Sequence, residues 1–247
     1  MVWGGMKNED RIIVALDVDS PDEGLGLVRQ LRGRVGLFKV GSQLFTSAGP
    51  PVVAGILRMG ERVFLDLKFH DIPNTAAKAA LAARAMGVSM ITVHAGGGSA
   101  MLSAVMAALK SAPAEPKRPL VVAVTLLTSL ASSDLESLGV AGSPADQVLR
   151  LAETALEAGV DGLVASPSEV ARLRRRFGSS PLLVTPGIRP AGTALNDQAR
   201  AATPQEALRA GSDFLVIGRP VTAAADPLRS LNRIIETIHG RAGDVVE

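Results

Sequence analysis

Short apolar runs alternate with segments of helical period along almost the whole chain. The apolar runs cover residues 12–17, 37–41, 62–68, 90–94, 120–125, 161–166, 182–186 and 214–218. The segments of helical period cover residues 21–31, 50–58, 75–86, 99–109, 145–158, 167–177, 204–210 and 227–238. A short apolar run bounded by turn residues predicts a buried strand, and apolar positions three and four apart predict an amphipathic helix. The pattern therefore predicts a strand and a helix repeated along the chain.

Residue types at the segment boundaries support this division. Several helical segments begin with a proline that follows a capping residue, at Ser20-Pro21, Ser143-Pro144, Ser166-Pro167, Thr203-Pro204 and Asp226-Pro227. The capping side chain accepts a hydrogen bond from the first turn, and proline suits the first helical position because its missing N–H is not needed there. Glycines that can end a helix follow other segments, at Gly60, Gly87, Gly159 and Gly211.

The repeat determines the predicted fold class. Near-continuous apolar strands joined by helices are typical of a parallel sheet covered on both faces. Eight such units predict an α/β fold, a single-domain (β/α)8 TIM barrel over residues 11–247. A doubly wound open sheet is the alternative, but no Gly-x-Gly-x-x-Gly follows the first strand, which argues against a dinucleotide-binding version. Residues 1–10 are predicted to be a disordered or loosely ordered extension.

The predicted strands carry polar residues at their carboxyl ends, which is where a barrel of this kind places its functional groups. Asp66 and Lys68 are two residues apart, so a strand puts both on one face. Asp71 follows in a turn, and Lys39 occupies a similar place in the second strand. A structural ion pair would explain Asp66 and Lys68 alone, but it does not explain Lys39. Charged groups gathered at strand ends therefore predict a functional site.

The last two strands are followed by glycine and arginine. Gly187 and Arg189 follow the seventh strand, and Gly218 and Arg219 follow the eighth. Glycine lets backbone N–H groups approach an anion, arginine supplies charge, and these two loops form the usual phosphate site of the barrel. The long segments 129–143 and 190–202 are predicted lids. Gln198 in the second lid reads, by pattern alone, as an ordinary surface residue.

Composition narrows the class of protein. Apolar residues make up 47% and charged residues 20%, as in a globular protein. The pI of 9.3 reflects a net charge of only +2 in a chain with few groups that titrate near neutrality. Aromatic residues make up 3%, and no basic arm is evident, so we expect no nucleic-acid partner.

Several further classes of site are not expected. The chain has no cysteine, which excludes disulfides and thiolate sites and fits a reducing compartment. No apolar run reaches about 18 residues and no signal peptide is evident, so we expect a cytoplasmic protein with no membrane partner. His70 and His94 lack partners at metal-ligand spacing, and lysines compete with a cation for the acids. We therefore expect no metal and no cofactor, with His94 as a structural residue.

Segment 66–75, which reads DLKFHDIPNT, resembles the signature of the orotidine 5′-phosphate decarboxylase family. Segments that resemble further family motifs follow in family order, at residues 13–17, 38–41, 93–97, 125–129, 185–189, 196–198 and 217–220. The resemblance covers nearly the whole chain and departs at no functional position. It implies a homodimer that converts orotidine 5′-phosphate (OMP) to UMP and CO₂, the last step of de novo pyrimidine biosynthesis, without a cofactor.

The resemblance also implies roles for individual residues. Lys68 donates a proton to C6 of the pyrimidine, and Asp66 lies against the substrate carboxylate. Lys39 and Asp17 hold ribose hydroxyls and orient the charged network. Thr128 contacts the pyrimidine region.

Other residues are implied to act at the two ends of the substrate or across subunits. Asp71 completes the charged network and, with Thr75, reaches the active site of the partner subunit. Ile72, next to Asp71 in the sequence, is implied to contact the substrate. The residues implied to hold or support the phosphate are Arg189, Gln198, Gly218 and Arg219.

Three alternatives remain open from the sequence. A sugar-phosphate decarboxylase or aldolase of the same superfamily shares Asp-x-Lys-x-x-Asp, but it needs Mg²⁺ and does not fit segment 72–75. A different barrel enzyme with a Schiff-base lysine is the second. The third is a non-catalytic barrel that only binds a nucleotide, against which the intact Asp66, Lys68 and Asp71 argue.

Overall fold

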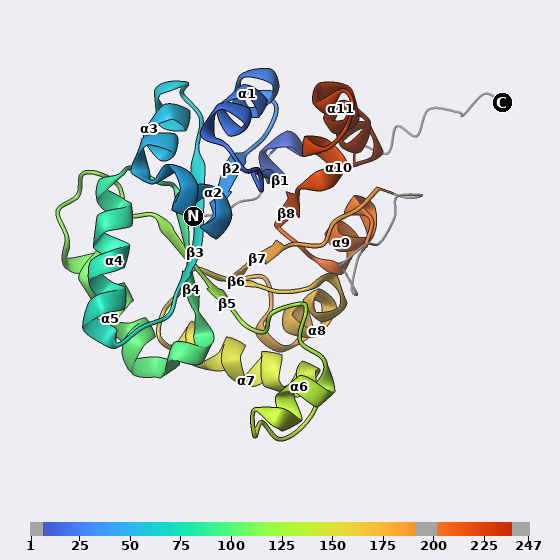
Figure 1. The fold of residues 1–247 in the computed structure, drawn as a ribbon. Coiled ribbons are helices and arrows are strands. Elements are labelled where there is room, and N and C mark those ends of the chain that lie inside the picture. The colour runs from blue at the N-terminus through green and yellow to red at the C-terminus, as the bar shows by residue number, and fades with distance from the viewer. Residues whose placement is uncertain (1–6, 191–201, 239–247) are drawn as a thin grey trace.

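The computed structural model describes residues 7–190 and 202–238. Parallel strands form a closed barrel in sequence order, with the last strand paired to the first (Figure 1). The strands are β1 (Ile12–Ala15), β2 (Leu37–Gly41), β3 (Val63–Phe69), β4 (Met90–His94), β5 (Leu120–Val124), β6 (Gly162–Val164), β7 (Leu182–Thr185) and β8 (Phe214–Ile217). The predicted (β/α)8 barrel is therefore confirmed, and the open doubly wound sheet is excluded.

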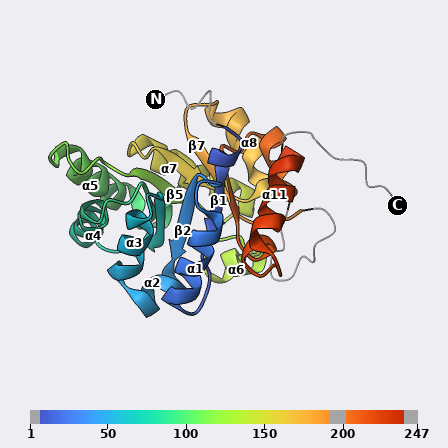
Figure 2. The same ribbon diagram turned by 90° about the horizontal axis from the view of Figure 1, so that it is seen from above.

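Helices surround this barrel on all sides. The predicted ones are α1 (Pro21–Leu31), α3 (Pro50–Arg58), α4 (Pro73–Ala85), α5 (Gly98–Ser111), α7 (Pro144–Glu157), α8 (Pro167–Phe177), α9 (Pro204–Ala210) and α11 (Pro227–Ile238). Figure 2 shows α4 and α5 on one flank and α8 and α11 on the opposite flank. Among the described residues no helix is long and apolar enough to cross a membrane.

Four of the five predicted capping side chains accept a hydrogen bond from their helix, and Ser166 is the exception. Ser20, Ser143 and Thr203 each accept a hydrogen bond from the amide three residues later, and Asp226 accepts one from the Arg229 amide at 2.9 Å. The four glycines predicted to end helices all have positive φ, which residues with a side chain rarely adopt; they are Gly60, Gly87, Gly159 and Gly211. Local capping therefore fixes where many of the helices begin and end.

The barrel interior changes from apolar to polar along the strands. Alternate strand residues point inward, and the inner cluster consists of Ile13, Ala15, Leu37, Phe64, Met90, Val122, Leu182, Val184, Phe214 and Val216. Two residues further along β2, β3 and β4, the same face carries Lys39, Asp66 and Thr92, all buried. The packed core therefore ends in a polar layer toward the carboxyl ends of the strands.

The observed strands stop earlier than predicted at several of their carboxyl ends. β1 ends at Ala15 rather than at Asp17, and β8 ends at Ile217 rather than at Gly218. β5, β6 and β7 are also shorter than the apolar runs that predicted them. The chain leaves the sheet at these points to form the loops above the barrel, and hydrophobicity alone does not mark that departure.

Short helices next to the strands were not predicted, because no capping side chain marks their start as Thr203 marks the similarly short α9. They are α2 (Ser42–Ala48), α6 (Ser132–Ser137) and α10 (Arg219–Thr222), with 3-10 turns at η1 (Glu9–Arg11) and η2 (Ala95–Gly97). Helix α6 lies within the first predicted lid, whereas most of the second lid lies outside the described residues. The predicted boundary at residue 10 stays a prediction, since residues 1–6 also lie outside them.

Two matching charged clusters lie at the amino ends of the strands, the bottom of the barrel. Asp161, just before β6, accepts hydrogen bonds from Arg118 and from an amide of β5, each at 2.7 Å. Asp213, just before β8, accepts hydrogen bonds from Arg174 and, at 2.8 Å, from an amide of β7. Each aspartate therefore ties its own strand to the neighbouring strand, and an arginine balances its charge.

We expect Asp213→Ala to lower the free energy of unfolding by about 2–3 kcal/mol, because it leaves the Leu183 amide without its acceptor and the Arg174 guanidinium without its carboxylate partner. Urea denaturation measures this change. The control is Glu153→Ala, which breaks an ion pair with Arg176 whose side chains are 47% and 57% exposed. Such pairs contribute less than about 1 kcal/mol. Equal losses in the two variants would contradict a special role for the bottom clusters.

Candidate active site

The carboxyl ends of the strands surround a cavity of about 530 Å³, a size typical of small-molecule sites. Its floor is the apolar barrel interior, where Ala15, Phe64, Val184 and Val216 line it. Most predicted site residues lie around its walls, namely Asp17, Lys39, Asp66, Lys68, Thr128, Arg189, Gly218 and Arg219. The fold therefore gathers into one site residues that are far apart in the sequence.

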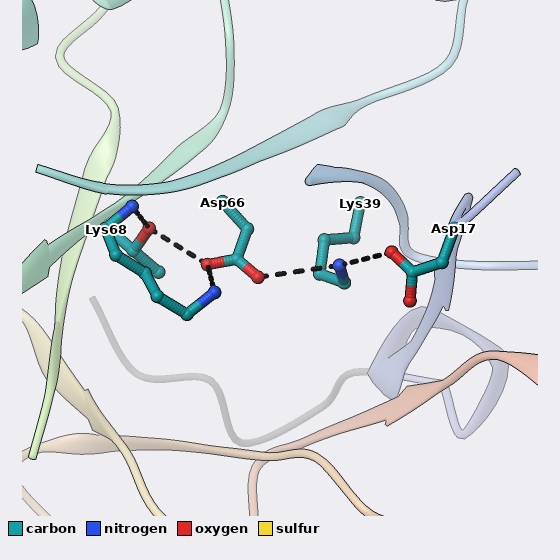
Figure 3. Close-up of polar contacts among 5 residues, drawn as sticks. Asp17, Lys39, Asp66 and Lys68 are labelled. Atoms are coloured by element: carbon teal, nitrogen blue, oxygen red, sulfur yellow. Dashed lines mark hydrogen bonds and ion pairs between the residues drawn. The ribbon is translucent and has the colours of Figure 1, made fainter. Parts of the chain in front are cut away.

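Four of these side chains form a row of alternating charge across the ends of β1, β2 and β3 (Figure 3). Lys39 Nζ lies 3.0 Å from Asp17 Oδ1 and 3.5 Å from Asp66 Oδ2. Lys68 Nζ lies 3.0 Å from the other oxygen of Asp66, Oδ1. Each interior charge of the row thus has opposite charges on both sides, which is how charged groups are accommodated away from water.

Asp66 is the most restricted member of the row, with only 8% of its surface exposed. Burial alone raises the pKa of a carboxyl group. The ammonium groups of Lys39 and Lys68, with hydrogen bonds from Lys68 and Thr92, outweigh this burial and hold the pKa of Asp66 below its ordinary value. Asp66 is therefore a carboxylate at neutral pH and carries the negative charge between the two lysines.

The backbone of β3 is irregular where it carries these groups. The regular pairs on either side of the irregularity are Leu65 with Ile91 and Phe69 with Val93. Residues 66–68 therefore stand opposite a single residue of β4, Thr92. Lys68 has φ 51°, the only positive φ outside glycine among the described residues. This conformation costs about 1–2 kcal/mol, and such irregularities re-aim side chains at active sites. Here the ammonium group of Lys68 is turned back onto Asp66.

Thr92 makes contacts that the sequence did not predict. Its hydroxyl, in a residue that is 1% exposed, donates to Asp66 Oδ1 at 3.0 Å and accepts from the Lys68 amide at 2.8 Å. A threonine inside an apolar strand reads as an ordinary β-branched residue. Gln43, which lines the cavity from α2, was missed because that helix was not predicted.

Asp71, Ile72 and Thr75 lie outside the cavity of their own chain. They follow β3 at the start of α4, where Asp71 Oδ1 accepts a hydrogen bond from the Ile72 amide at 2.6 Å. The side chain of Ile72 is 68% exposed, and Thr75 is also exposed. In the described part of the chain no ion pair joins Asp71 to Lys68. Among residues 7–190 and 202–238 of one chain, then, only Asp66 forms an ion pair with Lys68.

The ends of β7 and β8 bring glycine and arginine to the cavity side by side. Gly187 has φ 78°, a conformation that favours glycine, and lines the cavity with Arg189. Gly218 precedes α10, whose first residue is Arg219, and both line the cavity. Two guanidinium groups with nearby backbone amides suit a bound anion. Gln198 lies outside the described residues, so its predicted contribution stays a prediction.

The two histidines beside the site stack on each other, with ring centroids 5.0 Å apart. His94 Nδ1 accepts a hydrogen bond from the Gly96 amide at 3.0 Å. Burial, aided by the charges of His70 and Lys68, holds the pKa of His94 below its ordinary value, which keeps that nitrogen available as an acceptor. These contacts fit the structural role predicted for His94. No cluster of three or more potential metal ligands occurs among residues 7–190 and 202–238, and the expected absence of a metal stays a prediction.

Comparisons with known proteins agree with this geometry. The model of the orotidine 5′-phosphate decarboxylase / HUMPS family matches residues 10–234. Proteins named orotidine 5′-phosphate decarboxylase from Nitrosococcus oceani and Syntrophotalea carbinolica are 50% and 51% identical to this chain, over 92% of its length and 96% and 93% of theirs. A crystal structure of orotidine 5′-phosphate decarboxylase from Lactobacillus acidophilus has a TM-score of 0.82 at 38% identity, covering 92% of this chain and 98% of that one. Because these matches span most of both chains, this chain belongs to the orotidine 5′-phosphate decarboxylase / HUMPS family.

Proposed function

We propose that this protein decarboxylates OMP to UMP and CO₂, the last step of de novo UMP synthesis. The observation that carries the proposal is the row Asp17, Lys39, Asp66 and Lys68 above an apolar cavity floor. Relatives about half identical over 92% of the chain bear the decarboxylase name. The sugar-phosphate, Schiff-base and purely binding alternatives are not favoured by these relatives.

The reaction asks for electrostatic stabilisation. Loss of CO₂ from C6 of the pyrimidine leaves an electron pair in the plane of the ring, where the ring π-system cannot delocalise it. A fixed positive charge beside C6 stabilises this carbanion most strongly in a site that excludes water. Lys68 supplies that charge in our proposal and then transfers a proton to C6, which completes UMP.

Asp66 has two roles in the proposed mechanism. Its carboxylate holds the ammonium groups of Lys68 and Lys39 in place through ion pairs of 3.0 and 3.5 Å. In our proposal Asp66 also lies next to the carboxylate of bound OMP. Repulsion between these two negative charges destabilises the bound substrate and favours the departure of CO₂, in addition to the stabilisation of the carbanion. Because two lysines hold Asp66, it cannot move away from the incoming charge.

The remaining cavity residues bind the parts of OMP that do not react. We assign the ribose hydroxyls to Lys39 and Asp17 and the pyrimidine region to Thr128. The phosphate is assigned to the last two strands, with Arg189, Gly218 and Arg219, and with Gln198 from the second lid. The binding energy of a remote phosphate can be used to close and order the site, which raises turnover as well as affinity.

We also propose that two subunits share each active site. Asp71, Ile72 and Thr75 match the family signature, yet they lie outside the cavity of their own chain. Ile72 is 68% exposed at this point, so it is accessible to a partner subunit. In a two-fold dimer each contact occurs twice, so each chain would complete the site of the other. A cytoplasmic homodimer without nucleic-acid, membrane, metal or cofactor partners is part of this proposal.

The direct test of the activity is the loss of OMP absorbance on addition of the purified protein, and no loss would refute the proposal. We expect Lys68→Ala to lower kcat by at least about three orders of magnitude, which is about 4 kcal/mol of barrier. The variant should still bind a UMP analogue in a calorimetric titration. Lys110→Ala, on the exposed face of α5, is the matched control and should behave as wild type. A Lys68→Ala enzyme within tenfold of wild type would remove Lys68 from the mechanism.

If Arg219 holds the phosphate, Arg219→Ala should lower kcat/KM for OMP by about 30- to 150-fold, or 2–3 kcal/mol. The same change should hardly affect kcat/KM for orotidine, which lacks the phosphate. Arg175→Ala, at an exposed position of α8, is the control for loss of positive charge and should leave both values unchanged. Equal losses on the two substrates would mean that Arg219 is structural.

The shared site predicts complementation between two inactive variants. When Lys68→Ala and Asp71→Ala subunits exchange, a mixed dimer has one site with both defects and one site with neither. Random pairing makes about half the dimers mixed, so activity should rise to roughly a quarter of wild type. Native mass spectrometry measures the exchange independently. Confirmed exchange with no gain in activity would show that Asp71 acts within its own chain.

A further inference from the structure

We propose that Thr92 is a positioning residue of the active site, whose hydroxyl fixes the backbone of Lys68 and the carboxylate of Asp66 relative to each other. This inference rests on the proposed decarboxylase function for its kinetic consequences. Its structural part rests only on contacts within the barrel. Thr92 does not line the cavity, so we assign it no contact with substrate.

The direction of both hydrogen bonds is fixed by chemistry. An amide N–H can only donate and a carboxylate can only accept, so the hydroxyl must accept from Lys68 and donate its one proton to Asp66. The Thr92 hydroxyl oxygen lies 3.0 Å from Oδ1 of Asp66, to which it donates a hydrogen bond. Lys68 Nζ lies 3.0 Å from the same oxygen. Thr92 therefore holds the backbone of Lys68 directly. It also holds the Lys68 side chain indirectly, through the Asp66 oxygen that both residues contact.

The irregularity of β3 explains why a side chain is needed here. In a regular parallel pair, carbonyl groups of β4 would accept hydrogen bonds from every second amide of β3, while the amides between them face β2. Residues 66–68 stand opposite Thr92 alone, so the ladder is interrupted. The hydroxyl of Thr92 is the acceptor for the amide of Lys68, whose φ of 51° is otherwise unfavourable. Thr92 thus stabilises the backbone conformation that aims the Lys68 ammonium group at Asp66.

The position of Thr92 in the barrel supports a specific purpose. It faces inward two residues after Met90, which belongs to the apolar interior, and it is 1% exposed. A polar atom at such a position is unfavourable unless it is hydrogen-bonded. Valine has nearly the same shape and would fill the same space without a hydroxyl. The two hydrogen bonds, rather than packing, therefore explain why position 92 carries threonine and not valine.

The test compares Thr92→Val, which removes the hydroxyl, with Thr92→Ser, which keeps it. We expect Thr92→Val to lower kcat by about 10- to 100-fold, because a small misplacement of a catalytic group has effects of that size. Binding of UMP should change by less than about threefold, since no substrate contact is lost. Thr92→Ser should recover most of the lost kcat.

The pH dependence of kcat/KM distinguishes the hydrogen bond of Thr92 from its packing, because a change in packing alone would not shift the acid limb. Thr92→Val removes one of the hydrogen bonds that lower the pKa of Asp66, so the acid limb of kcat/KM should shift to higher pH. The other ionisable groups around Asp66 and Lys68 are unchanged in all variants; they are Asp17, Lys39, His70 and His94. The control is Thr185→Val, which removes a fully buried hydroxyl bonded to Ser212 at 2.7 Å in another part of the barrel. It should lower stability without moving the acid limb.

Amide hydrogen exchange tests the structural part without any activity. The Lys68 amide should exchange faster in Thr92→Val than in wild type or Thr92→Ser, whether or not the protein turns over OMP. Equal exchange of that amide in all three proteins would overturn the proposal. If the wild-type enzyme is active, an unchanged kcat and an unchanged acid limb in Thr92→Val would also overturn the proposal. Equal losses of kcat in Thr92→Val, Thr92→Ser and Thr185→Val would overturn it as well. A wild-type protein without OMP turnover would overturn the decarboxylase function alone.

Discussion

The Asp66 carboxylate, nearly buried between two lysine ammonium groups, is the interaction on which the rest of the site depends. Burial alone would raise the pKa of this carboxyl group, and the two ammonium groups outweigh that effect. The carboxylate therefore keeps its charge in surroundings where charge acts strongly on a reacting centre. The contact between Lys39 and Asp66 requires a fixed register between β2 and β3. The hydrogen bond from Thr92 to Asp66 requires a fixed register between β3 and β4.

The barrel separates stability from function along its axis. At the bottom, Asp161 and Asp213 join neighbouring strands through short hydrogen bonds to backbone amides, each balanced by an arginine. In the middle, apolar side chains fill the interior. At the top, that filling gives way to the charged row and to a strained lysine backbone. The lower two layers provide the rigidity that lets the upper layer retain an unfavourable conformation.

Much of this arrangement could be predicted from local sequence. The alternation of apolar runs with helical segments predicted the barrel because burial on both faces leaves a direct mark on each strand. Lys39, Asp66 and Lys68 stood out because charged residues at the ends of apolar runs are rare without a purpose. The short helices α2 and α10 left no such mark, since neither begins with the capping side chain that marks the similarly short α9.

The sequence by itself determined the residue types, the order of the strands and the end of the barrel at which the charges gather. Only the tertiary structure decided that residues 66–68 stand opposite Thr92, that Lys68 adopts a positive φ, and that Asp71 lies outside its own cavity. The physical reason is that strand register and backbone strain follow from pairing between segments distant in the chain. Local patterns specify which faces are buried, whereas the partner strand specifies which atoms meet.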